Sequence, residues 1–295
     1  MSTEIIEFYA EDGVILNGYI NKGKIKTEQV LIQIHGMTSN CFKNREKIIS
    51  KNVEGIGIDS ICFNTRGSDI VKYIKYEDGK KALGGTAYED VEESYYDIVG
   101  AIKYALQLGY QKIYLQGHSL GATKIMYTYN KMKKNNDLNL EYVKAIILLS
   151  LVDIPYMFNK FLMQEHLEFA ARKEKENNLL ELMPSNSFIN LISVKTFLRY
   201  TKYNKDIDFA KFSEENYDFK ELNCIDVPLF IRWGNNKELI ERKADDQVNF
   251  INSKIKNKIK DINFIDGADH SFSDKEEILG HEICTFLNNI LDKEQ

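Results

Sequence analysis

Short apolar runs alternate along this chain with longer stretches in which apolar residues recur every three or four positions, and this alternation most constrains its fold. The pattern predicts a largely parallel β-sheet that is covered by helices on both faces. The expected strands are residues 30–34, 56–63, 112–116, 145–151, 229–233 and 262–265. The expected helices include residues 120–133, 240–255 and 274–291. A further helix is expected to open at Thr86-Ala87-Tyr88-Glu89, which has the form of a capping box, and to end at Gly109.

The pattern changes between about residue 154 and about residue 222. Strand-like runs are absent there, and apolar side chains such as Phe158, Leu167 and Phe197 are set in charged helical sequence. Because the strand–helix alternation resumes afterwards, we interpret this segment as a helical insertion over one end of the sheet. The sequence therefore predicts one α/β domain, with a core of residues 1–153 and 223–295 and a helical cap at 154–222.

Composition excludes several classes of function. Lys and Arg total 39 against 44 Asp and Glu, a formal net charge of −5, which gives no electrostatic reason to expect a nucleic-acid partner. The four cysteines have no metal or redox spacing, so we expect reduced thiols in a cytoplasmic protein. Residues 1–13 do not resemble a signal peptide, and the longest apolar stretch, 145–152, is too short to span a bilayer. We expect no membrane insertion, no metal and no organic cofactor.

The segment Gly117-His118-Ser119-Leu120-Gly121 lies between an expected strand and an expected helix. It matches the G-x-S-x-G pattern in the strand-before, helix-after context that this motif requires. Glycines two residues either side of the serine are needed because the turn is tight and crowded. The serine then lies at a helix N-terminus, where exposed N–H groups favour developing negative charge. Ser119 is thus the predicted nucleophile, and the alternative is an unreactive serine in a glycine turn.

A nucleophilic serine needs a base, and the chain has five histidines. His270 follows the expected strand 262–265, at the strand's C-terminal edge, where ligands bind in such sheets. It also comes after the serine near the end of the chain, as the order Ser, acid, His demands. The other four fit less well. His118 is inside the turn Gly117–Gly121 that carries the serine, here called the elbow, and His35 belongs to a strand-end turn. His166 is in the insertion and His281 is in the last helix. We predict His270 as the base.

Three segments together resemble the α/β-hydrolase superfamily: His35-Gly36-Met37 after a strand, the elbow around Ser119, and Gly267-Ala268-Asp269-His270-Ser271-Phe272. The resemblance spans nearly the whole chain outside the insertion, and it implies the α/β-hydrolase fold. It also implies that the backbone N–H groups of Met37 and Leu120 form an oxyanion hole. A closer likeness, to esterase- and lipase-like members of poorly defined substrate, is carried by Gly84-Gly85-Thr86-Ala87-Tyr88-Glu89 and Gln116-Gly117-His118-Ser119-Leu120-Gly121-Ala122.

The third member of the triad departs from the superfamily pattern. After residues 229–233 the family usually places an aspartate a few residues beyond a glycine, whereas this chain reads Gly234-Asn235-Asn236-Lys237-Glu238. Lys237 stands where the aspartate is expected, and Glu238 follows it. A glutamate can orient a histidine as well as an aspartate can, so Glu238 is the first candidate for the acid.

Asp153 is the second candidate, because it ends the strand 145–151, an alternative location that the superfamily uses. Asp245 and Asp246 lie in an expected helix, and Asp269 is adjacent to the histidine and poorly placed to reach its ring.

These residues predict a serine hydrolase that cleaves a small-molecule carboxylic ester through an acyl-enzyme on Ser119. Thioesters and activated amides remain open within the same mechanism. A non-catalytic ligand-binding protein of the same fold is the alternative, and the unusual acid is its best support. The apolar residues of the insertion would suit a greasy acyl or alcohol group, although packing of the cap alone would also require them.

Overall fold

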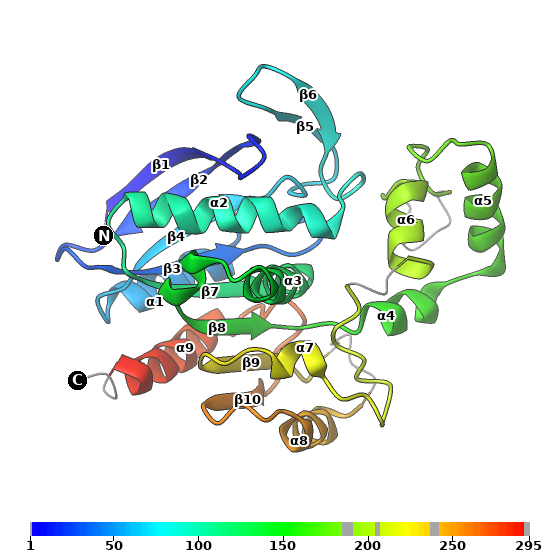
Figure 1. The fold of residues 1–295 in the computed structure, drawn as a ribbon. Coiled ribbons are helices and arrows are strands. Elements are labelled where there is room, and N and C mark those ends of the chain that lie inside the picture. Colours follow the sequence, from blue (N-terminus) through cyan, green and yellow to red (C-terminus); the bar gives the residue numbers. More distant parts are fainter. Residues whose placement is uncertain (1, 185–190, 204–206, 237–241, 292–295) are drawn as a thin grey trace.

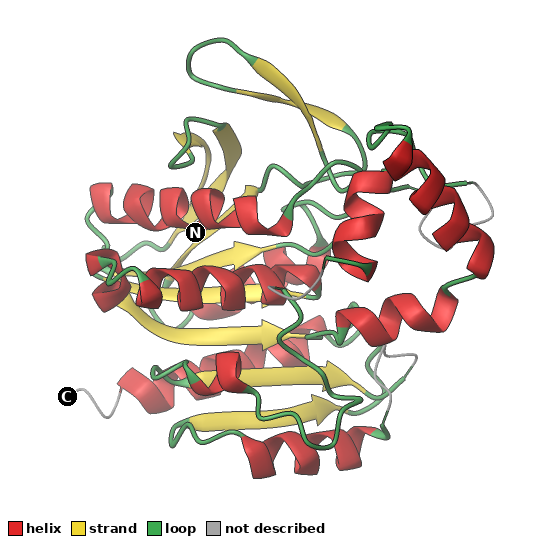
Figure 2. Ribbon diagram, turned by 45° about the vertical axis from the view of Figure 1, so that its right-hand side comes forward, coloured by secondary structure: helices red, strands yellow, loops and turns green. Residues whose placement is uncertain are grey.

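The computed structural model describes residues 2–184, 191–203, 207–236 and 242–291. Its main sheet has eight strands in the order β1-β2-β4-β3-β7-β8-β9-β10, with helices on both faces (Figures 1 and 2). The strands are β1 Ser2–Tyr9, β2 Ile15–Lys22, β3 Gln29–Ile34, β4 Asp59–Asn64, β7 Lys112–His118, β8 Val143–Leu149, β9 Leu229–Gly234 and β10 Lys260–Ile265. β1 and β2 are antiparallel to their neighbours, and the strands from β4 to β10 pair in parallel. The predicted sheet is confirmed.

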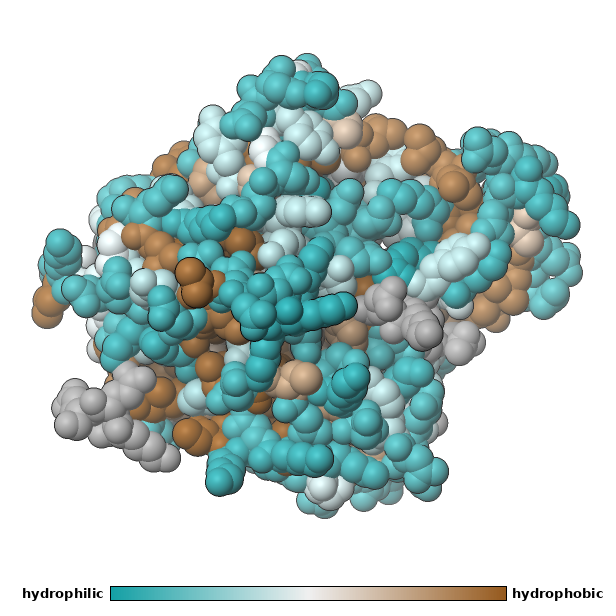
Figure 3. Space-filling model, viewed as in Figure 1, coloured by the Kyte–Doolittle hydropathy of each residue, from teal (hydrophilic) through white to brown (hydrophobic). Residues whose placement is uncertain are grey.

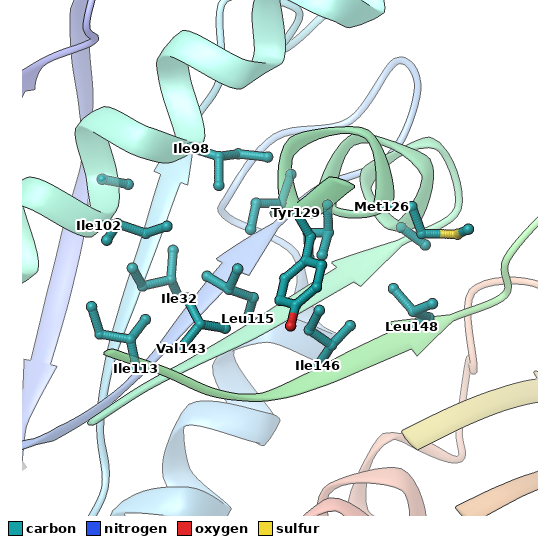
Figure 4. Close-up of a cluster of buried hydrophobic side chains, with 14 of the residues drawn as sticks. Ile32, Ile98, Ile102, Ile113, Leu115, Met126, Tyr129, Val143, Ile146 and Leu148 are labelled. Carbon is teal, nitrogen blue, oxygen red and sulfur yellow. The ribbon is translucent and has the colours of Figure 1, made fainter. Parts of the chain in front are cut away.

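The alternation of side chains along each strand builds two separate cores. In β3, Val30, Ile32 and Ile34 face one helix layer, and Leu31 faces the other, because successive side chains of a strand point to opposite faces. The first layer contains α2 (Ser94–Gln107), α3 (Leu120–Lys134) and α8 (Ala244–Lys254). Figure 4 shows its centre, where strand residues such as Ile32 meet Ile98 of α2. The second layer contains α1 (Asn44–Glu54) and α9 (Glu276–Leu291).

The predicted opening of a helix at Thr86 is wrong. Residues 91–93 form a short 3-10 turn and α2 begins only at Ser94. Thr86 instead accepts a hydrogen bond from the N–H of Thr38 at 2.8 Å, and the buried Glu89 pairs with Lys124 of α3. The capping-box residues are thus used in tertiary contacts. The predicted end of the helix at Gly109 is confirmed, because this glycine adopts a positive φ of 95° just after α2.

Part of the predicted insertion lies outside the sheet layers, beyond the carboxyl ends of the parallel strands (Figures 1 and 2). It contains α4 (Ile154–Phe161), α5 (Gln164–Lys175) and α6 (Val194–Thr201), which share an apolar cluster of their own with residues such as Phe158 and Tyr200. By contrast, Phe212 and Phe219, near α7 (Lys220–Asn223), pack in the core of the main sheet. The division into a core and a cap at residues 154–222 stays a prediction.

A small hairpin, β5 (Lys72–Lys75) with β6 (Lys81–Gly84), projects from the body of the molecule (Figure 1). Hydrophilic residues cover most of the face seen in Figure 3, with hydrophobic patches between them. Within the described ranges, no helix has both the length and the apolar character to cross a membrane. The cytoplasmic location stays a prediction.

Candidate active site

Ser119 lies in the turn between β7 and α3, with φ 54° and ψ −122°. A positive φ is rare for a residue other than glycine and marks local strain. The surrounding backbone holds this conformation. The N–H of Ser119 donates to the carbonyl of Leu149 in β8 at 2.8 Å, and its own carbonyl accepts from the N–H of Ala122 at 2.9 Å. The serine is thus anchored to both the sheet and the helix that follows it.

The two glycines of the elbow are required by close backbone contacts. A Cβ on Gly117 would lie 2.4 Å from the carbonyl oxygen of Gly121. A Cβ on Gly121 would lie 2.5 Å from the carbonyl oxygen of Ile34 and 2.6 Å from that of His35. Since these contacts are with backbone atoms, no side-chain movement relieves them. The spacing of the glycines therefore reflects the crowding that the sequence predicted.

His270 faces the serine. Its Nε2 lies 2.9 Å from the Oγ of Ser119, across 151 residues of sequence. The histidine follows β10 on a loop whose turn is held by Asp269, because Oδ1 of Asp269 accepts hydrogen bonds from the N–H groups of Ser271 and Ser273, each at 2.9 Å. The structure thus brings together the two residues that the sequence singled out as nucleophile and base.

The backbone of His270 is held from two sides. Its carbonyl oxygen lies 2.7 Å from Nε2 of His118 and accepts a hydrogen bond from the Oγ of Ser150 at 2.9 Å. Burial, followed by the nearby charge of Arg45, lowers the pKa of His118 well below its ordinary value. The ring is therefore neutral, and its Nε2 must carry the hydrogen in order to donate to a carbonyl. From the sequence alone, His118 is recognised only as unsuited to act as the base.

His35 supports the loop on the opposite side of the serine. Its Nδ1 lies 2.9 Å from the carbonyl oxygen of Gly36, and its Nε2 accepts from the N–H of Thr65 at 3.2 Å. Burial, followed by the charge of Lys124, lowers the pKa of His35 to about 3. The neutral ring therefore donates from Nδ1 to Gly36. This carbonyl belongs to the same peptide unit as the N–H of Met37, so His35 fixes the direction of that N–H.

The two predicted oxyanion donors flank the serine. Leu120 follows Ser119 as the first residue of α3, which is the N-terminal end of a 15-residue helix. Gly36 approaches from the other side, since a Cβ there would lie 3.1 Å from the Cβ of Ser119. The peptide that carries the Met37 N–H is therefore next to the nucleophile. The next residue, Thr38, also has a positive φ of 54°.

The candidate acids are placed differently. Asp153 is buried, and its Oδ1 accepts from the N–H of Tyr156 in the first turn of α4 at 2.9 Å. Its Oδ2 accepts from both the N–H and the Oγ of Ser213, at 3.1 and 2.7 Å. The carboxylate of Asp153 thus joins α4 to the segment that returns to the sheet. Glu238 lies outside the described residues, and Asp245 and Asp246 are in the first turn of α8.

Two cavities of opposite character meet at Ser119 and His270. One has a volume of about 450 Å³ and is lined largely by polar side chains, among them Lys43, Asn44 and Ser271. The other has a volume of about 180 Å³ and is lined largely by apolar ones, among them Val152 and Phe158. Met37 and Thr38 line both. Ser119 and His270 therefore line both a polar and an apolar cavity.

No protein-family model matches the chain, and no curated protein matches it either. Solved structures do match. Est1E from Butyrivibrio proteoclasticus, in a structure with bound ferulic acid, is 19% identical with a TM-score of 0.64, over 97% of this chain and 99% of that one. The α/β-hydrolase GrgF from Penicillium sp. sh18 is 16% identical with a TM-score of 0.64, over 98% and 99%. The esterase Pf2001 from Pyrococcus furiosus is 17% identical with a TM-score of 0.60, over 98% and 92%. These likenesses concern the fold.

Proposed function

Since this chain has the α/β-hydrolase fold, as its sequence predicted, we propose that it is a serine hydrolase that cleaves carboxylic esters. The observation that carries the proposal is the 2.9 Å contact between Oγ of Ser119 and Nε2 of His270. A serine at a strained turn, at a helix N-terminus and within hydrogen-bond reach of a histidine, is the arrangement of an activated nucleophile. The solved structures named esterases add support from proteins of the same fold.

In the proposed reaction, His270 takes the proton of Ser119 as its Oγ attacks the ester carbonyl. The N–H groups of Met37 and Leu120 donate to the oxyanion of the tetrahedral intermediate. His270 then gives the proton to the alcohol oxygen as the carbon–oxygen bond breaks, which leaves an acyl group on Ser119. A water molecule, deprotonated by His270, attacks the acyl-enzyme and releases the acid, and the proton returns to Ser119.

Glu238 is the proposed acid that orients His270. The other candidate, Asp153, is less suited to this role, because both of its carboxylate oxygens already accept hydrogen bonds from Tyr156 and Ser213. A carboxylate in this role keeps the imidazole in the tautomer that presents a bare Nε2 to the serine, and it stabilises the imidazolium that forms.

A fluorophosphonate probe tests the proposal directly, because it phosphonylates an activated serine much faster than an ordinary one. We expect stoichiometric labelling of the wild-type chain, with the adduct located on Ser119 by peptide mass spectrometry. Ser119→Ala should lose labelling and lower kcat on short p-nitrophenyl esters by about four to six orders of magnitude. The matched control is Ser253→Ala, on the exposed side of α8.

Turnover by Ser119→Ala within tenfold of the wild type would overturn the assignment of the nucleophile. A folded wild-type chain that neither labels nor hydrolyses esters would instead favour a non-catalytic binding protein of the same fold.

A further inference from the structure

We propose that the substrate joins a short apolar acyl group to a polar, hydroxyl-bearing alcohol. This inference rests on the proposed function and adds to it the chemical class of both halves of the ester. Two cavities of different size and polarity meet at Ser119, and the acyl group and the alcohol each occupy one of them.

The direction of proton transfer decides which half enters which cavity. His270 must give its proton to the leaving oxygen, so the alcohol lies on the side of the His270 loop. The polar cavity is lined by this loop, through Ser271 and Ser273 as well as His270 itself. The apolar cavity also reaches His270, but it includes no other residue of this loop and is lined instead by Leu120, which follows the nucleophile. The alcohol therefore faces the polar cavity, and the acyl group faces the apolar one.

The apolar cavity sets the size of the acyl group. Its volume of about 180 Å³ holds about six non-hydrogen atoms, at about 30 Å³ for each water-sized group. Its walls include the segment that follows β8, α4 and α6, with the rings of Phe158 and Tyr200 4.8 Å apart between their centroids. Both side chains are almost fully buried, so this wall is fixed by packing. Acyl chains of about four to seven carbons fit, and longer ones meet the aromatic wall.

The polar cavity sets the character of the alcohol. Its volume of about 450 Å³ holds about fifteen non-hydrogen atoms. Lys43, Asn44 and Arg45, at the start of α1, supply donors, and Glu276 of α9 supplies a carboxylate. The amide of Asn44 already donates to Glu276 at 3.1 Å, so donors and acceptors alternate along the wall. An apolar alcohol would remove water from these groups without replacing its hydrogen bonds, which is unfavourable, whereas hydroxyl groups would replace them.

Two series of esters test the two halves separately. In p-nitrophenyl esters of linear acids, kcat/KM should be highest at about four to seven carbons and at least about tenfold lower at twelve. In butyrate esters, 1-monobutyrylglycerol and pentyl butyrate carry alcohol groups of equal size but opposite polarity. We expect kcat/KM to be at least about tenfold higher for the glycerol ester.

Variants of the walls link each preference to its cavity. Met157→Ala, which shortens a half-buried side chain that lines the apolar cavity, should move the optimum to longer acyl chains. The matched control is Met163→Ala, whose side chain is exposed just before α5 and does not line the cavity. Lys43→Leu should reduce the preference for the glycerol ester, whereas Lys47→Leu, on the exposed side of α1, should leave it unchanged.

Failure of the inference is distinguishable from failure of the proposed function. Absence of fluorophosphonate labelling at Ser119 removes the function, and the inference with it. Labelling of Ser119 combined with an optimum at twelve carbons, a preference for pentyl butyrate or no hydrolysis of either butyrate ester overturns the inference alone. Labelling with the expected profiles, shifted by Met157→Ala and Lys43→Leu but not by their controls, supports it.

Discussion

At the scale of residues, three histidines surround the nucleophile, and only one of them faces it. His270 presents its Nε2 to Ser119, whereas His118 and His35 direct their rings at backbone carbonyls on either side. Burial keeps both of these rings neutral, which suits them to holding backbone in place. Each holds a peptide next to a proposed catalytic group: His118 the carbonyl of His270, and His35 the peptide that carries the Met37 N–H.

We predict that His118 positions His270. His118→Phe removes the donor to the His270 carbonyl and should lower kcat by about ten- to a hundredfold with little change in KM, because small displacements of a catalytic group are costly. His118→Gln retains an N–H donor and should recover part of the loss. Steady-state kinetics measure both values, and the tryptophan fluorescence of each variant checks that it is folded. A wild-type kcat in a folded His118→Phe variant would contradict this role.

The acid gives a second prediction at this scale. Glu238→Gln should lower kcat by several orders of magnitude, because an amide can favour the wrong tautomer and cannot offset the imidazolium charge. Asp153→Asn should have little effect on kcat, although it should lower the midpoint of thermal unfolding by weakening the bonds to Ser213. The kcat values of the two variants are measured with the same ester. The reverse ranking of the two kcat values would assign the acid to Asp153.

At this scale, functional residues are predictable from the sequence where a motif includes the strand and helix around it. The elbow and the loop after β10 predicted that Ser119 and His270 lie together, and the structure has them in contact. Their catalytic roles stay predictions. The sequence did not reveal the functions of His118, Ser150 and Thr86, since each depends on a hydrogen bond to a residue remote in the sequence. The only local signal was that His118 and His35 each stand beside a glycine, at the end of a strand or just after it.

At the scale of elements, the elbow depends on how closely α3 approaches β3. Gly121→Ala should destabilise the protein by about 1–3 kcal/mol, because its Cβ would overlap the carbonyl oxygens of Ile34 and His35. Urea unfolding measures this difference. The matched control is Gly23→Ala, whose Cβ would find its nearest neighbours at 3.5 Å or more, an ordinary contact distance. Equal stability of the two variants would show that the elbow tolerates a wider separation.

The elements that the sequence predicts well are those whose apolar residues are buried in the core. The parallel strands are nearly continuous apolar runs because both of their faces are buried. The strands β1 and β2 and the hairpin β5–β6 were not foreseen. β1 and the hairpin lie at an edge of the main sheet or outside it and expose many of their side chains. In β2 the apolar run is interrupted by Asn17, Gly18 and Asn21. The helix predicted to begin at Thr86 is wrong for a different reason. Thr86 and Glu89 do not cap a helix but contact Thr38 and Lys124.

At the scale of the whole molecule, neutral buried histidines tie stability to pH. The ordinary pKa of 6.5 for histidine is lowered to about 3 for His35 in the folded chain. Between these values the unfolded chain binds a proton that the folded chain does not, so stability is fully present above about pH 6.5 and falls as the pH is lowered. One such group contributes about 1.4 kcal/mol per pH unit, or about 2 kcal/mol between pH 6.5 and pH 5.

We therefore expect the free energy of unfolding of His35→Gln to fall less between pH 7.5 and pH 5 than that of the wild type, by about 2 kcal/mol. Urea titrations at the two pH values measure it. His281→Gln, at an exposed position of α9, should show the wild-type dependence. An unchanged pH dependence in His35→Gln would mean that the folded chain protonates this ring as readily as the unfolded chain does.

The positive φ of Ser119 also bears on the order of events in folding. A backbone conformation of this kind is unfavourable by about 1–3 kcal/mol in an isolated segment, so the turn forms only once β8 and α3 are docked against it. Trp233, the single tryptophan, is buried in β9 and donates to the carbonyl of Leu151, so its emission reports the docking of β9. In refolding by rapid dilution, reactivity of Ser119 should appear together with or after the Trp233 signal, because nucleophilicity here is acquired with native packing and not before it.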